Sequence, residues 1–289
     1  MDISLALGAG GAKGVSHIGV LRQLEKHGYH IRAIAGTSFG GVVGAVYAAG
    51  YSVDELEQIF ARVDQRHLYG FRQQDNASLY GLAGIEQWLT ETIGDCTFAD
   101  LKIPFAVVAV DLNSAREVIL CEGRVRDAIL STIALPSIFT PFRADGMELV
   151  DGGIFDPVPV SMARSLAPHL PVVAVVLADP IGEPARVPSF HLPIPEPIVR
   201  QLTRLRITQA FGVFMRSLDV SDRLLTDLRL KIDKPDVVVR PDVTDIGLLD
   251  VVDIHEVAGR GETALETALP DLKRVTAWPK RLSRRLIGG

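Results

Sequence analysis

Short apolar runs recur along this chain, and they constrain its fold more than any other feature. ISLAL (3–7), PFAVVAV (104–110) and PVVAVVLA (171–178) are almost wholly apolar, and IRAIA (31–35) contains a single arginine. Runs of this length suit β-strands, and a strand that is apolar throughout is covered on both faces. The runs therefore predict a sheet buried between other elements.

Helical patterns alternate with these strands. Ile18, Leu21 and Leu24 form one apolar helix face that stops at Gly28, and a small-residue helix follows GTSFGG (36–41) to about position 49. Further helices are expected over VDELEQIFARV (capped by Ser52 and Glu55), IEQWLTETI, RVRDAILSTI and 255–269, and further strands over 116–121, 147–150 and 236–241. The alternation predicts an α/β fold with a largely parallel sheet and helices on both sides.

The composition of the sequence changes after Asp179, where six prolines lie between positions 180 and 197. A helical stretch that mixes leucine, phenylalanine and arginine follows them. No internal repeat is apparent. We therefore expect a single domain over residues 1–289, with a cap or subdomain within 180–235.

The composition excludes several classes of function. A net charge of −5 over 289 residues gives no general attraction to nucleic acid, so no nucleic-acid partner is expected. Cys96 and Cys121 form no metal or redox spacing, and no HExxH, EF-hand or paired CxxC motif occurs, so we expect no metal and no other cofactor. The start, MDISLALGAGG, has no basic n-region. We expect a cytoplasmic protein, with peripheral contact at the inner face of the membrane as an option.

The segment from 33 to 53 has no charged residue and is long enough to span a membrane. Its glycines and hydroxyl residues favour a buried strand, turn and helix instead. Within it, GTSFG (36–40) matches G-x-S-x-G, in which a nucleophilic serine occupies a sharp strand-to-helix turn. Gly36 and Gly40 remove side chains that would collide there. The alternative role for Ser38 is a place in a helix-packing seam of small residues.

A second glycine-rich turn, GAGGAKG (8–14), lies between the first strand and the first helix. It fits neither the Walker pattern nor the GxGxxG dinucleotide pattern. Its free backbone amides suit an oxyanion hole, and the alternative is a close-packed turn without a ligand.

A nucleophilic serine needs a base, and no histidine of this chain lies in a convincing motif. Asp151 in VDGG (150–153) follows the end of a strand, and Gly152 and Gly153 leave its carboxylate approachable. Its alternative role is to cap a turn.

The order and spacing of GAGGAKG, GTSFG, STIALPSIFTPF (131–142) and VDGG resemble the patatin-like phospholipase family, in particular its bacterial members. The resemblance covers about residues 3–180. It implies a three-layer α/β/α sandwich with a mostly parallel central sheet. It also implies a serine acyl hydrolase, namely a phospholipase, lysophospholipase or esterase that cleaves carboxylic ester bonds, with a lipid or ester as the partner. The oligomeric state stays open.

The resemblance also implies the site. Ser38 matches the nucleophile and Asp151 the base of a Ser–Asp dyad, and Gly10, Gly11 and Lys13 match the oxyanion-binding stretch. A carboxylate with an ordinary pKa of about 3.9 is a weak base. The dyad therefore requires burial of Asp151, which raises this pKa.

This chain departs from the family pattern at two positions, because Ala9 replaces a frequent glycine and Asp156 a frequent asparagine. Two other functions are open on the sequence alone. One is an α/β-hydrolase with a Ser-Asp-His triad, whose third member would be His169, His191 or His255. The other is a regulatory or adaptor protein with little hydrolysis.

Overall fold

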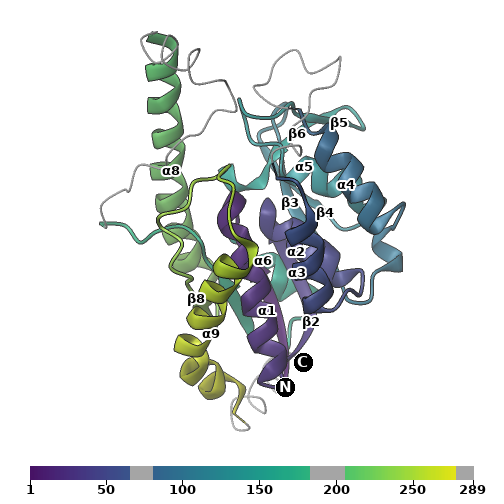
Figure 1. Cartoon of the computed structure of the whole chain (residues 1–289), viewed down its shortest axis with the longest axis vertical. Helices are drawn as coiled ribbons and strands as arrows, with labels where there is room; N and C mark the ends of the chain where they lie inside the picture. Colours follow the sequence, from purple (N-terminus) through teal and green to yellow (C-terminus); the bar gives the residue numbers. More distant parts are fainter. Residues whose placement is uncertain (66–80, 183–205, 278–289) are drawn as a thin grey trace.

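A single mixed sheet forms the centre of the described part of the molecule (Figure 1). The computed structural model describes residues 1–65, 81–182 and 206–277. The strand order is β5-β6-β3-β2-β1-β7-β8, and β4 also pairs with β3. The strands are β1 (Asp2–Leu7), β2 (His30–Thr37), β3 (Phe105–Asp111), β4 (Arg116–Leu120), β5 (Phe142–Ala144), β6 (Met147–Asp151), β7 (Val172–Val175) and β8 (Val237–Val239).

The sheet is mostly parallel, as predicted. The pairs β1–β2, β1–β7, β2–β3 and β7–β8 run parallel. The pairs β3–β4, β3–β6 and β5–β6 run antiparallel and join the sheet at β3. The sequence pattern did not indicate β5, because a strand of three residues is too short to show a periodicity.

Helices occupy the intervals between the strands. They are α1 (Ser16–Lys26), α2 (Phe39–Ala48), α3 (Val53–Arg62), α4 (Ala83–Ile93), α5 (Val125–Thr132), α6 (Val160–Leu166), α8 (Arg206–Asp233) and α9 (Ile254–Thr276), with short 3-10 turns η1 (Gly11–Val15), η2 (Phe98–Asp100) and η3 (Gly152–Ile154). The capping box predicted for α3 is confirmed, because Ser52 Oγ accepts from the Glu55 N–H and the Glu55 carboxylate accepts from the Ser52 N–H.

The predicted end of the last helix was wrong. Residues 255–269 were expected, whereas α9 continues through Pro270 to Thr276. A proline costs a helix one hydrogen bond, but Leu272 and Val275 beyond it are buried in the core. This burial favours continuation of the helix past the proline.

Alternate side chains of β1 point to opposite faces of the sheet and reach a different helical layer on each face. Leu5 and Leu7 enter a large core shared with α1, α2, α5 and α9, whereas Ala6 faces a smaller core shared with α6. On that second side Ser4 Oγ donates to the carbonyl of Ala163, 2.6 Å away. The helices therefore cover both faces of the sheet, and the predicted three-layer sandwich is confirmed.

The predicted cap falls partly outside the described residues, because its range of 180–235 includes 183–205. Of the cap segment, Arg206–Asp233 forms α8. The cap and the single domain stay predictions. None of the described helices is long and apolar enough to cross a membrane.

Candidate active site

Ser38 occupies the turn between β2, which ends at Thr37, and α2, which begins at Phe39. Its backbone has φ 53° and ψ −127°, a conformation that residues with a side chain rarely adopt. Holding such a residue costs on the order of 1–3 kcal/mol, and such strain clusters at functional sites. The packing-seam alternative does not require it.

The path of β3 brings the ends of two other strands together. Thr37 of β2 pairs with Val108, and Asp151 of β6 pairs with the next residue, Ala109. Because β4 pairs with Val107–Asp111, it occupies one edge of β3, and β2 and β6 must share the other. β2 runs parallel to β3 and β6 antiparallel, so their carboxyl ends meet. This junction places Ser38 beside Asp151.

The two side chains are in direct contact. Ser38 Oγ donates a hydrogen bond of 2.6 Å to Asp151 Oδ2, and the Gly153 N–H donates one of 2.8 Å to Oδ1. Asp151 is only 3% exposed. Burial raises the pKa of Asp151 to about 6, and the bonds from Ser38 and Gly153 oppose the rise. Such a carboxylate is mostly ionised at neutral pH, and it is a stronger base than an ordinary aspartate.

The end of α5 and the residues that follow it hold both Ser38 and Asp151 by their main chain. Thr132 Oγ1 accepts a 3.0 Å hydrogen bond from the Ser38 N–H and donates to the carbonyl of Val108. The carbonyl of Ala134 accepts from the Asp151 N–H at 3.0 Å. Sequence reasoning assigned no role to Thr132, although it lies inside the motif STIALPSIFTPF.

The glycine loop approaches the same turn from the end of β1. Its flanking amides are in use, because the Ala9 N–H donates to the Pro157 carbonyl and the Ala12 N–H to the Leu248 carbonyl, both at 2.9 Å. The N–H groups of Gly10 and Gly11 donate to no residue that the structure describes. These two N–H groups can donate hydrogen bonds to a ligand oxygen.

Close packing joins the loop to the nucleophile's helix. A Cβ on Gly40 would overlap the carbonyls of Leu7 and Gly8, so only glycine lets α2 begin against the end of β1. A Cβ on Gly36 would lie 2.6 Å from the backbone of Gly41. A side chain at either glycine of GTSFG would therefore collide with neighbouring backbone, as predicted.

His17 supports the glycine loop through a contact with its first residue, a role that sequence reasoning missed. It is fully buried, and its Nε2 lies 2.9 Å from the carbonyl of Gly8. Burial lowers the pKa of His17 to about 4, so the ring is neutral at pH 7 and Nε2–H is the donor.

Comparison with known proteins identifies the chain. A sequence model of patatin-like phospholipases matches residues 5–164, which are more than half of the chain and include Ser38, Asp151 and the glycine loop. The chain belongs to the patatin-like phospholipase family.

Relatives of this patatin-like chain include an uncharacterised NTE family protein of Mycobacterium bovis, 37% identical over 187 residues, which are 64% of this chain and 51% of the relative. Lysophospholipase NTE1 of Saccharomyces cerevisiae is 29% identical over 172 residues, 56% of this chain and 10% of that protein. The match thus spans about half of the mycobacterial relative and a tenth of the yeast one. VipD of Legionella pneumophila shares the fold, with a TM-score of 0.56, 12% identity and coverage of 94% of this chain and 66% of VipD.

Lys13 and α8 add charge to the patatin-like site. The Lys13 side chain is buried, and its ammonium has no hydrogen bond or ion pair with any described residue. Burial and the charge of Asp219 raise the pKa of Asp222 on α8 to about 7, and the charge of Lys13 opposes the rise. The charge of Asp151 also contributes to the raised pKa of Asp222. Sequence reasoning missed Asp222, because α8 carries no family motif.

The described histidines do not bond to Ser38 or Asp151. His169 is exposed in the loop after α6, and His255 Nδ1 lies 2.7 Å from Glu57 Oε1. His191 lies outside the described residues.

Each of the two departures from the family pattern has a contact in the structure. Ala9 replaces a frequent glycine, and its N–H still donates to Pro157. Asp156 is 2% exposed and lies 3.8 Å from Arg229 Nε of α8. Burial raises the pKa of Asp156 to about 7, which Arg229 opposes.

A Cβ on Gly152 would overlap the carbonyl of Val108, so the turn after Asp151 packs directly against β3.

Proposed function

We propose that this patatin-like protein is a lipid hydrolase that cleaves carboxylic ester bonds, with Ser38 as nucleophile and Asp151 as base. The observation that carries the proposal is the 2.6 Å hydrogen bond from Ser38 Oγ to the buried Asp151 carboxylate. A nucleophilic serine needs an adjacent acceptor for its proton, and this carboxylate is in reach.

The reaction then proceeds in two halves. Ser38 Oγ attacks the ester carbonyl while its proton passes to Asp151 Oδ2, and the collapse of the tetrahedral intermediate expels the alcohol, which takes that proton. Water attacks the acyl-serine next, gives a proton to Asp151, and the fatty acid leaves as Ser38 regains its hydrogen. The pKa of Asp151 is raised to about 6, which reduces the difference between the pKa of the base and that of the serine hydroxyl.

The glycine loop is proposed to hold the oxyanion. The free amides of Gly10 and Gly11 are the donors, and a donor of this kind contributes on the order of 3–4 kcal/mol to the stability of the transition state. The buried ammonium of Lys13 adds positive charge beside them and suits an anionic part of the substrate. The family and the relatives named lysophospholipases support a lysophospholipid or related lipid ester as substrate. Peripheral contact with a lipid surface is proposed as the way in which the protein reaches such a substrate.

Hydrolysis of lysophosphatidylcholine, followed by mass spectrometry of the released fatty acid, tests the proposal. We expect turnover by the wild type and losses of at least about 1,000-fold in Ser38→Ala and Asp151→Ala. Ser165→Ala and Asp127→Asn, which lie away from the site, are matched controls and should keep wild-type turnover. Unfolding curves show that each variant is folded.

A fluorophosphonate probe separates this function from the two alternatives. Labelling of Ser38 in the folded protein supports an enzyme, whereas a folded protein that neither labels nor hydrolyses would favour a regulatory or adaptor role. Loss of turnover in His169→Ala, His191→Ala or His255→Ala would instead favour a Ser-Asp-His triad.

A further inference from the structure

The carboxyl-terminal third of the chain lies outside the family match at 5–164, yet it contacts the glycine loop directly. The Leu248 carbonyl accepts a 2.9 Å hydrogen bond from the Ala12 N–H. Gly11 has φ +56°, and a Cβ on it would overlap the carbonyl oxygen of Leu248. The main chain of Leu248 therefore packs against the loop that presents the Gly10 and Gly11 amides.

A tight turn presents this carbonyl. The Gly247 N–H donates a 2.7 Å hydrogen bond to Asp250 Oδ2, and the Asp250 N–H points back to the Gly247 carbonyl at 3.4 Å. The side chain of Leu249 packs against Ile138 and Phe139, which follow the segment that holds Ser38 and Asp151. The turn thus lies between the glycine loop and the other wall of the site.

The turn is anchored on both sides. Before it, Ile246 and Val243 are buried in the large core. After it, Gln65 forms two hydrogen bonds with Val252, accepting from its N–H at 3.0 Å and donating to its carbonyl at 2.8 Å. The cap of α9 is separate from these anchors, because the Asp253 side chain accepts, among the described residues, only from the Glu256 N–H of its own helix.

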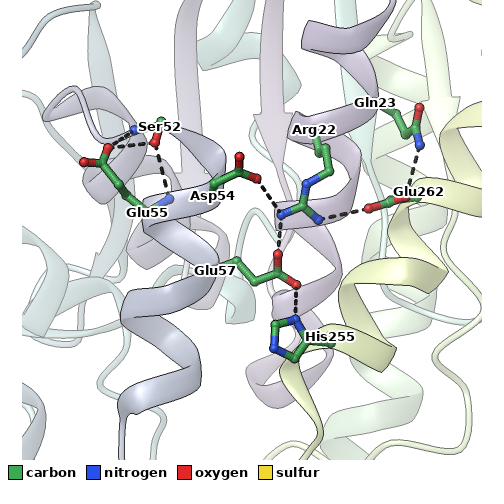
Figure 2. A network of polar contacts seen from close by, with 8 residues as sticks. All are labelled: Arg22, Gln23, Ser52, Asp54, Glu55, Glu57, His255 and Glu262. Carbon is green, nitrogen blue, oxygen red and sulfur yellow. Dashed lines mark hydrogen bonds and ion pairs between the residues drawn. The ribbon is translucent and has the colours of Figure 1, made fainter.

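Helix α9 itself is locked to the helix that follows the glycine loop. In Figure 1 the yellow-green α9 lies beside the purple α1, and a Cβ on Gly261 would overlap the carbonyl of Ser16. Figure 2 shows the polar contacts that join α1, α3 and α9, where Arg22 of α1 contacts Glu57 of α3 and, at 2.9 Å, Glu262 of α9. His255 of α9 contacts Glu57 in turn. These contacts fix the turn relative to α1.

We propose that the turn Gly247–Asp250 positions the oxyanion loop, and that Asp250 is a positioning residue. By holding the Ala12 N–H, the Leu248 carbonyl fixes the loop in the conformation that leaves the Gly10 and Gly11 amides free for the substrate oxygen. The hydrogen bond that the Gly247 N–H donates to Asp250 Oδ2 sets the direction of the Leu248 carbonyl. This inference rests on the proposed function for its effect on catalysis, whereas the contact itself does not.

Two measurements on Asp250→Ala test the proposal. Loss of the acceptor loosens the turn, so the amide of Ala12 should exchange its hydrogen at least about 10-fold faster. On a short-chain p-nitrophenyl ester, kcat should fall by about 10- to 100-fold while KM stays within about 2-fold, because a displaced oxyanion donor affects the transition state and not the bound ester. Asp250→Asn keeps an acceptor oxygen and should restore both values.

Asp253→Ala is the matched control, because it removes an aspartate cap in the same segment without touching the turn. It should lower the free energy of unfolding and leave Ala12 exchange and kcat unchanged. Unchanged Ala12 exchange in Asp250→Ala would overturn the proposal, and so would faster exchange with unchanged kcat. A wild type that hydrolyses no ester would refute the proposed function instead, and Ala12 exchange would then decide whether the turn holds the loop.

Discussion

Replacement of Asp151 by asparagine should stabilise the protein at neutral pH. In the folded protein burial raises the pKa of Asp151 from 3.8 to about 6, so the folded state disfavours the ionised form. A pKa unit corresponds to 1.36 kcal/mol, and this rise therefore costs about 3 kcal/mol of stability once the carboxyl is ionised. Asparagine keeps the shape and lacks the charge.

The sign of the effect follows from linkage. A group with a raised folded pKa contributes stability that is complete below its unfolded pKa of 3.8 and is lost as the pH rises to about 6. The free energy of unfolding of Asp151→Asn, minus that of the wild type, should therefore grow by about 2 kcal/mol between pH 4 and pH 7, because pH 4 already lies above the unfolded pKa of 3.8. Most of this increase in the free-energy difference should occur below about pH 6.

Urea unfolding of both proteins at half-unit steps of pH measures this difference. Asp156 titrates in both proteins, so its contribution largely cancels. Removal of the Asp151 charge lowers the pKa of Asp222, which enlarges the difference in the same direction. Asp127→Asn, which removes a partly exposed ion pair with Arg124, controls for the substitution itself. A difference that stays constant from pH 4 to pH 7, or that shrinks as the pH rises, would refute the account of a buried, destabilising base.

Three further predictions concern Asp151, Gly261 and His17. The kcat/KM for ester hydrolysis should fall about tenfold per pH unit below about pH 6, because protonated Asp151 accepts no proton; a flat profile down to pH 5 would contradict this. Gly261→Ala should destabilise the fold by about 1–3 kcal/mol or more in thermal unfolding, because its Cβ overlaps the Ser16 carbonyl, and an unchanged Tm would contradict the tight helix crossing. The pKa of His17 is lowered from 6.5 to about 4, so stability is complete above pH 6.5 and about 3 kcal/mol of it is lost as the pH falls to 4. His17→Gln should remove that part of the pH dependence in urea titrations, and a variant with the wild-type slope would show that another group causes it.

Much of the fold was predictable because its signals are local. An apolar run such as PVVAVVLA needs no partner to indicate a buried strand, and Ser52 with Glu55 indicates a helix start within four residues. The two residues proposed for catalysis were predicted in the same way. Each lies in a short turn motif, and the family resemblance joined them; the structure brings their side chains to 2.6 Å.

The remaining features depend on contacts distant in sequence. That β2 and β6 share one edge of β3 follows from the register of three strands, which no single segment encodes. The support of the glycine loop by Leu248 joins residues more than 200 positions apart through a backbone carbonyl, which any residue type supplies. Asp222 was not predictable either, because its environment comes from the glycine loop and from Asp151.

The central claim is that Ser38 is acylated with Asp151 as its base. Mass spectrometry of the intact protein, quenched during turnover of a lysophospholipid or a p-nitrophenyl ester, tests it most directly. We predict an acyl adduct on Ser38 in the wild type, none in Ser38→Ala, and formation slowed by at least about 1,000-fold in folded Asp151→Asn. An acyl adduct on another residue, or an undiminished rate of Ser38 acylation in Asp151→Asn, would contradict the account.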